Sequence, residues 1–252
     1  MSDVTNLNLF SEKYKSLKSE INKVIVGQDD IIDQILISIF SGGHALLIGV
    51  PGLAKTLMIN TIAKVLGLDF KRIQFTPDLM PSDIIGSEIL NENRQFQFIK
   101  GPVFSNIVLA DEINRTPPKT QSALLEAMQE HAVTVAGKRY EMNEPYFVLA
   151  TQNPIEQEGT YPLPEAQLDR FMFAVYLNYP SFEEEIEVVK LTTGEMKYTL
   201  KPVLDASQIK LFIEVIRKMP IADNVVEYAV DLVSKTRPNS ERSTNFINEY
   251  VS

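Results

Sequence analysis

The chain has 252 residues, 44% of them hydrophobic, which suits one large domain or a core domain with a smaller second one. A formal net charge of -9 disfavours a nucleic-acid binder, and the absence of cysteine excludes disulfides, thiolate metal sites and a cysteine nucleophile. The polar N-terminus has no apolar signal core, and the longest apolar stretch, residues 31–40, is too short to span a bilayer. We therefore expect a soluble, cytoplasmic protein with no membrane insertion.

Two helices are predicted at the start of the chain. Apolar residues recur at helical spacing between residues 10 and 24, with lysines and glutamates between them. After a turn at residues 26–28, Asp29 and Asp30 suit the positive end of a second helix, whose apolar face spans residues 31–39. The glycine pair at residues 42–43 ends this helix.

The next segment carries the strongest motif of the chain. An apolar strand at residues 44–48 is followed by GVPGLAKT at residues 49–56 and then by a helix pattern at residues 57–66. A strand, a glycine-bearing turn, Lys-Thr and a helix form a phosphate-binding P-loop, in which backbone N–H groups face phosphate oxygens. Lys55 would reach the β- and γ-phosphates, and Thr56 would hold Mg²⁺. Ala54 departs from the pattern, which has a second glycine there.

Two later strands also end in polar groups that a nucleotide triphosphatase needs. The apolar strand at residues 107–110 ends in Asp111 and Glu112, and the strand at residues 146–150 is followed by Asn153. In an open parallel sheet, ligands bind at the carboxyl ends of the strands. We expect Asp111 to hold Mg²⁺ through a coordinated water, Glu112 to act as general base, and Asn153 to bond the γ-phosphate or orient the attacking water.

The remaining elements complete an α/β fold. Residues 71–75 alternate as another strand, residues 172–177 form the last one, and two hairpins are inserted, one around the turn at residues 91–93 and one at residues 133–140. From residue 180 only helical patterns remain, the first of which begins with a capping box of Ser181 and Glu184. The sequence thus predicts a five-stranded parallel core at residues 1–179 and a small all-helical domain at residues 180–252.

Three further side chains have simple structural explanations. Arg170 could pair with Asp169 or Glu165, which on sequence alone is as reasonable as a catalytic role. Neither His44 nor His131 is placed like a ligand or a base, so both are expected to be structural.

With these residues in place, the chain resembles the AAA+ ATPases, and within them the MoxR family, over residues 24–190. GVPGLAKT is similar to that family's P-loop, which commonly carries alanine at the position of Ala54. We infer that the backbone there has the helical φ < 0 that alanine tolerates. Residues 111–115 resemble the Walker B segment, residues 151–154 resemble sensor 1, and residues 163–171 resemble the segment that bears the arginine finger.

The resemblance implies a fold, a ligand and partners. The fold is an AAA+ P-loop NTPase core with inserted β-hairpins, followed by a helical lid, and the ligands are ATP and Mg²⁺. The implied catalytic residues are Glu112, Asn153 and Arg170, and the implied metal residues are Thr56 and Asp111. The implied nucleotide-binding residues are Val26, Gly27, Gly49, Val50, Pro51, Gly52, Leu53, Ala54, Lys55, Thr56 and Leu57. Members form rings, commonly hexamers, in which Arg170 would act on the neighbour's nucleotide.

The implied role is chaperone-like: ATP-driven assembly or activation of partner complexes, often with von Willebrand factor A-domain proteins. One departure is that no residue matches the family's sensor 2 arginine, since Arg237 and Arg242 lie outside any such motif. A DNA-acting motor, a chelatase-like metal-insertion subunit and a non-hydrolysing nucleotide switch remain alternatives. The negative net charge argues against the DNA motor. The basic residues Lys138 and Arg139 at a hairpin tip are the only feature in favour of it.

Overall fold

The computed structural model describes residues 3–156, 159–194 and 199–250. The chain forms two compact units, Met1–Ile216 and Arg217–Ser252. The outermost residues of the two predicted domains, 1–2 and 251–252, lie outside the described ranges. Within those ranges, no helix is both long enough and apolar enough to cross a membrane.

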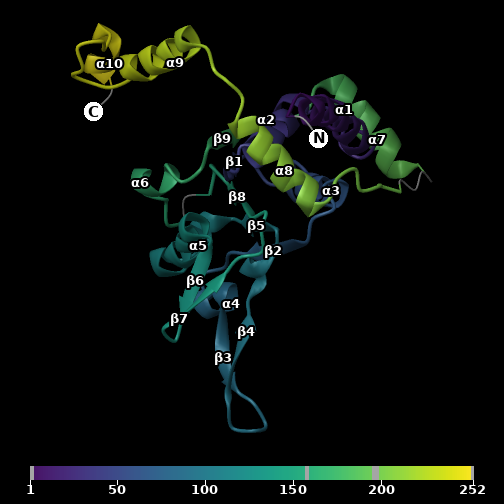
Figure 1. Ribbon diagram of the computed structural model, residues 1–252, viewed down its shortest axis with the longest axis vertical. Helices are drawn as coiled ribbons and strands as arrows, with labels where there is room; N and C mark the ends of the chain where they lie inside the picture. Colours follow the sequence, from purple (N-terminus) through teal and green to yellow (C-terminus); the bar gives the residue numbers. More distant parts are fainter. Residues whose placement is uncertain (1–2, 157–158, 195–198, 251–252) are drawn as a thin grey trace. The chain divides into compact units, whose positions relative to one another are not determined.

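A five-stranded parallel sheet forms the centre of the first unit (Figure 1), in the order β2-β5-β8-β1-β9. The strands are β1 (Ala45–Ile48), β2 (Phe70–Gln74), β5 (Ile107–Asp111), β8 (Phe147–Gln152) and β9 (Phe173–Tyr176). Every residue of β5 is buried, which agrees with its apolar run at residues 107–110. The five predicted strands and their parallel arrangement are therefore confirmed.

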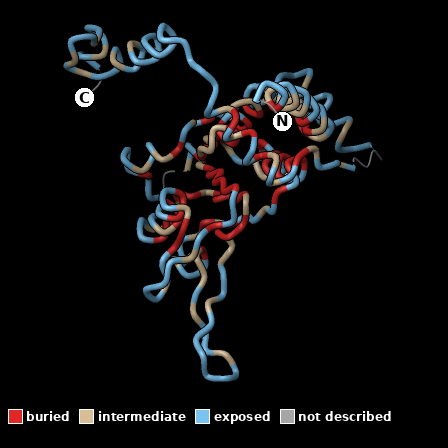
Figure 2. The backbone as a smooth tube through the Cα atoms, viewed as in Figure 1, coloured by how far each residue is buried: buried red, intermediate tan, exposed pale blue. Residues whose placement is uncertain are grey.

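Helices cover both faces of this sheet. Successive residues of a strand point to opposite faces, so each strand contributes apolar side chains to two separate cores. Ala45 and Leu47 belong to a core with α1 (Asp3–Ile21), α2 (Asp29–Phe40), α3 (Lys55–Val65) and α8 (Ala206–Arg217). Leu46 belongs instead to a second core, together with residues of α4 (Pro81–Ile85), the 3₁₀ turn η1 (Pro102–Phe104) and α5 (Pro118–Glu130). Figure 2 shows the buried residues gathered along the sheet between these helices.

Both inserted hairpins are present. The first pairs β3 (Gly86–Leu90) with β4 (Phe96–Lys100) and is largely exposed (Figure 2), and the second pairs β6 (Ala132–Val135) with β7 (Lys138–Glu141). The rings of Phe98 and Tyr140 stack with their centroids 4.1 Å apart, so the two hairpins contact each other. The other short elements are η2 (Ile113–Arg115) and α6 (Glu165–Leu168).

The helices after β9 do not all belong to the second compact unit. The predicted capping box of Ser181 and Glu184 starts α7 (Phe182–Thr193), and α8 follows it. Phe212 of α8 is 1% exposed and packs edge-on against Phe10 of α1, with ring centroids 5.2 Å apart. The compact units therefore divide after Ile216, later in the chain than the predicted start of the helical domain at residue 180.

The second unit contains α9 (Asp223–Lys235) and α10 (Asn245–Tyr250). Asp231 forms an ion pair with Lys235 within α9 at 2.6 Å, and a second one with Arg242 at 2.9 Å that joins α9 to the segment before α10. Apolar side chains of α9 and α10 remain exposed, including Tyr228 at 69% and Phe246 at 66%.

Candidate functional site

The turn between β1 and α3 has the conformation of a phosphate-binding loop. Gly52 has φ +91° with open space around it, which only a glycine adopts without strain. A Cβ on Gly49 would lie 2.9 Å from Cβ of Leu177, so this glycine permits a close approach of two backbones. Lys55 folds back and donates hydrogen bonds to the carbonyls of Gly49 and Val50, the latter at 3.1 Å. Burial lowers the pKa of Lys55, and the charges of nearby acidic groups oppose that shift.

Ala54 corrects one expectation. It was expected at helical φ < 0, but it lies at φ +54° and ψ +23°, in the left-handed region, directly before α3. Ala54 is the N-cap residue of α3, so the left-handed conformation lies where the loop passes into the helix. A left-handed conformation costs an alanine about 1–2 kcal/mol. The glycine of the general P-loop pattern would suit this backbone, whereas Ala54 is strained.

Asp111, at the end of β5, is fixed by two neighbouring strands. Arg72 of β2 donates to its Oδ2 from Nε at 3.0 Å and from Nη2 at 2.6 Å. The hydroxyl of Thr151 in β8 donates to Oδ1 at 2.6 Å. The Asp111 side chain is 11% exposed, so these bonds compensate a carboxylate that has lost most of its water.

Glu112, the next residue, is also held by several hydrogen bonds. Its backbone has φ +57°, and its N–H donates to Oγ1 of Thr151 at 2.8 Å. Its Oε2 accepts hydrogen bonds from Nε2 of Gln74 at 2.8 Å and from Nη1 of Arg115 at 2.9 Å. A left-handed glutamate is uncommon, and such strain clusters at functional sites.

Asn153 follows β8 and is buried, with 9% exposure. Its Oδ1 accepts from the N–H of Ile155 at 3.2 Å, and its Nδ2 donates to Oε2 of Glu156 at 3.4 Å. Glu156 also lies 3.9 Å from Arg115, so the residues after β5 and after β8 are joined.

These groups line one cavity of about 320 Å³. Its lining residues are Pro51, Gly52, Leu53, Ala54, Lys55, Thr56, Leu57, Asp111, Glu112 and Asn153. Side chains from three strand ends are thus brought together around the P-loop, as the order of the strands predicts. Arg170, by contrast, follows α6 and is not among the residues that line this cavity; its backbone N–H donates to the carbonyl of Gln167 at 3.3 Å.

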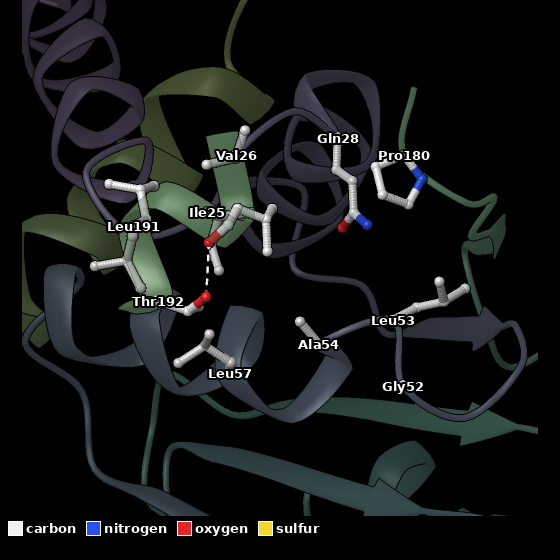
Figure 3. Close-up of a pocket in the computed structure, with 12 residues that line it drawn as sticks. Ile25, Val26, Gln28, Gly52, Leu53, Ala54, Leu57, Pro180, Leu191 and Thr192 are labelled. Atoms are coloured by element: carbon white, nitrogen blue, oxygen red, sulfur yellow. Dashed lines mark hydrogen bonds between the residues drawn. The ribbon is translucent and has the colours of Figure 1, made fainter. Parts of the chain in front are cut away.

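A second cavity, of about 150 Å³, adjoins the P-loop on its helix side (Figure 3). It is lined by Val24, Ile25, Val26, Gln28, Gly52, Leu53, Ala54, Leu57, Pro180, Val188, Leu191 and Thr192. Its mostly apolar wall suits the flat face of a base next to a phosphate site. The predicted residue Val26 is part of this wall, whereas Gly27 is not. A Cβ on Gly27 would lie 2.2 Å from Oε1 of Glu184, so the glycine permits a close approach of this turn to α7.

Sequence reasoning missed several residues of these sites. Arg72, Gln74 and Thr151 reach the carboxylates only because β2, β5 and β8 are neighbours, and no motif marks the first two. The α7 residues of the second cavity follow a helical pattern that gives no sign of a ligand. Among these residues, only Gln28 could have been found from its neighbours in the sequence, because it belongs to the predicted turn at residues 26–28.

The two histidines lie at the opposite end of the strands. His44 precedes β1 and is buried; its Nε2 bonds the carbonyl of Met128 at 3.2 Å, and its Nδ1 accepts from the N–H of Val148 at 3.0 Å. Burial lowers the pKa of His44 to about 4. His131 bonds Glu144 at 2.6 Å. Both histidines have structural partners at a distance from the cavities.

The sheet order, the strand-to-helix loop and the carboxylates at the end of β5 define a P-loop ATPase of the AAA+ class. Residues 44–173 match the ATPase family associated with various cellular activities (AAA). The uncharacterized protein YeaC of Bacillus subtilis is 51% identical over 86% of this chain and 68% of its own length. The chaperone MoxR1 of Mycobacterium tuberculosis is 46% identical over 92% of this chain and 62% of its own. The chain belongs to the MoxR family of AAA+ ATPases.

A solved structure agrees with this assignment. A protein of Cytophaga hutchinsonii, provisionally described as an ATPase, superposes with a TM-score of 0.85 at 49% identity, over 92% of this chain and 71% of its own. The chain thus spans between about three fifths and three quarters of the length of these three relatives.

Proposed function

We propose that this protein hydrolyses ATP with Mg²⁺ and uses the cycle to remodel partner protein complexes, as a chaperone-like member of its family. The observation that carries the proposal is the single cavity shared by the P-loop, Asp111, Glu112 and Asn153. Its donors suit a triphosphate: a lysine, backbone N–H groups at the start of α3 and an uncharged amide. The apolar cavity next to it would take the adenine.

The donor set fits Mg²⁺. This ion prefers hard oxygen ligands, keeps several waters, and is commonly bound through one or two protein groups together with substrate phosphates. Thr56, in the first turn of α3, and Asp111 supply a hydroxyl and a carboxylate to one cavity. When bound, the ion would neutralise charge on the phosphates. Thr56 would hold it directly and Asp111 through a coordinated water.

Glu112 is the proposed general base, and Asn153 the proposed sensor of the γ-phosphate. The Glu112 carboxylate must turn toward the attacking water, so its bonds to Gln74 and Arg115 would have to rearrange once ATP binds. Asn153 can donate from its amide without adding charge, although its Nδ2 now bonds Glu156.

Arg170 is proposed to act in trans within a homo-oligomeric ring of six subunits. It lines neither described cavity of its own chain, which is what an arginine acting on a neighbour's nucleotide requires. Arginine fingers contribute about 10³–10⁵ in turnover. A von Willebrand factor A-domain protein is the proposed type of partner.

DNA is a poorer candidate for a partner. The second hairpin carries Lys138 and Arg139, but Arg139 already bonds Glu141 at 2.9 Å and lies 3.8 Å from Glu130. These acidic groups raise the pKa of Arg139 and compensate its charge. Salt-sensitive stimulation of ATP hydrolysis by DNA would favour the motor over the remodeller.

The proposal is tested by Mg²⁺-dependent phosphate release from ATP. Glu112→Gln should bind ATP but lose about 10²–10⁴-fold in turnover, because the general base is removed. Lys55→Ala should lose nucleotide affinity. Glu12→Gln, an exposed glutamate on α1, is the matched control and should keep wild-type turnover. Unchanged turnover in both site variants would contradict the site, and nucleotide exchange without turnover in the wild type would favour a switch.

The remodelling role needs a separate experiment. Glu112→Gln, loaded with ATP, should retain partner proteins that Lys55→Ala releases, since only the former holds the ATP state. Recovery of proteins of small-molecule biosynthesis alone would count against remodelling and for a chelatase-like role.

A further inference from the structure

The edge strand β2 contributes an arginine to the Walker B carboxylates. Arg72 forms two hydrogen bonds to the same oxygen of Asp111, from Nε at 3.0 Å and from Nη2 at 2.6 Å. Its own side chain is 47% exposed, whereas that of Asp111 is 11% exposed. A half-exposed arginine therefore reaches inward to a nearly buried carboxylate.

Arg72 approaches Asp111 from outside the phosphate cavity. Asp111 lines that cavity and, within the described residues, Arg72 does not. Thr151 holds the other oxygen, Oδ1, at 2.6 Å from the β8 side. A carboxylate offers about four acceptor positions, of which the bonds found in the described chain use both on Oδ2 and one on Oδ1. One position on Oδ1 is left for a further donor.

The same arginine also orients Glu112. Its Nη2 donates to Oε1 of Gln74, two residues along β2 and on the same side of the strand. This bond fixes which end of the Gln74 amide faces the arginine, so Nε2 is the end that donates to Glu112, at 2.8 Å. Arg72 is thus connected to both acidic residues at the end of β5.

We propose that Arg72 is a positioning residue of the metal site, which holds Asp111 so that its free acceptor position receives a metal-coordinated water. This inference rests on the proposed function, because it assumes that Mg²⁺–nucleotide occupies the cavity. Hydrogen-bond partners that orient metal-binding groups typically contribute 10–100-fold to metal affinity. The guanidinium suits this task because its planar fork makes two bonds to one carboxylate, which an ammonium cannot reproduce.

The test is the gain in nucleotide affinity that Mg²⁺ provides. Binding of a non-hydrolysable ATP analogue is measured by calorimetry with Mg²⁺ and with EDTA, for wild type, Arg72→Ala, Arg72→Lys and Lys71→Ala. Lys71 is exposed and neighbours Arg72 on the strand, but its side chain points to the other side. We expect Arg72→Ala to reduce the Mg²⁺-dependent gain by about 10–100-fold and to leave affinity in EDTA within about twofold. Arg72→Lys should recover only part of the gain, and Lys71→Ala should resemble wild type.

Each other outcome overturns the proposal in a recognisable way. An unchanged Mg²⁺ gain means that Arg72 does not act on the metal site, and an increased gain means that it competes with the ion for Asp111. An equal loss of affinity with and without Mg²⁺, with a lowered melting temperature, assigns Arg72 a purely structural role. If wild type binds no analogue in either buffer, the proposed ATPase function fails instead.

Discussion

The buried histidine at the start of β1 should make stability depend on pH. The neutral ring of His44 satisfies both its neighbours, because Nε2–H donates to Met128 and unprotonated Nδ1 accepts from Val148. Protonation at Nδ1 would set two donors, Nδ1–H and the N–H of Val148, against each other at a buried position. Burial is the main cause that lowers the pKa of His44 from 6.5 to about 4, with His131 acting in the same direction and the Met128 carbonyl and Glu144 opposing it.

The direction in which stability changes with pH follows from proton binding to His44 in the folded and unfolded chains. Below the unfolded pKa of 6.5 the unfolded chain binds a proton that the folded chain rejects, so stability falls as the pH decreases toward 4. Between about pH 8 and pH 4.5 this single group should remove about 2.5 kcal/mol, and the loss levels off below the folded pKa.

The measurement is urea unfolding of wild type and His44→Asn across this pH range. All other titrating groups are shared, so the difference between the two stability curves isolates His44. The wild-type curve should fall more steeply, by about 2.5 kcal/mol in total. His131→Asn is the matched control: it removes only a lesser cause of the lowered pKa of His44, so it should keep most of the steep fall. Parallel curves for wild type and His44→Asn would refute the reasoning, because they would mean that the folded site accepts the proton.

Two further predictions concern the backbone and the packing of α8. Ala54→Gly removes the cost of a left-handed alanine, about 1–2 kcal/mol, but adds about 0.5–1 kcal/mol of unfolded-chain entropy. The free energy of unfolding in urea should therefore stay equal or rise by up to about 1.5 kcal/mol, and a clear loss would contradict the strained conformation. Phe212→Ala should cost about 3–5 kcal/mol, since this ring is 1% exposed, whereas Phe246→Ala, at 66% exposure, should cost little. Equal melting temperatures of the two variants would mean that α8 does not pack against Phe10.

The core of the fold and the centre of the site follow from short stretches of sequence. An apolar strand, a glycine-bearing turn and Lys55-Thr56 are local, so their pattern predicts their conformation directly. Asp111, Glu112 and Asn153 could be placed together without coordinates, because parallel strands present their carboxyl ends at one edge of a sheet. To predict that these residues lie close together, one need only assume that the strands are parallel and close to one another.

What the sequence did not reveal depends on contacts between distant segments or on the exact backbone path. The φ of Ala54 depends on how the loop enters α3, and alanine gives no signal for a left-handed turn. Arg72 reaches Asp111 only because β2 lies beside β5, and hydrophobic periodicity does not specify that order. The position of α8 could not be predicted for a similar reason. An amphipathic pattern shows which face of a helix is buried, but not which surface the face packs against.

The sequence by itself therefore determined the class of this protein, the loop that would hold phosphate and the acidic residues opposite it. Only the tertiary structure decided how those acidic residues are oriented and which elements enclose the second cavity, beside the P-loop. The physical reason is that a motif records chemistry at adjacent positions, whereas the orientation of a side chain is set by whatever packs against it. Here Arg72, Gln74 and Thr151 make those contacts from two neighbouring strands.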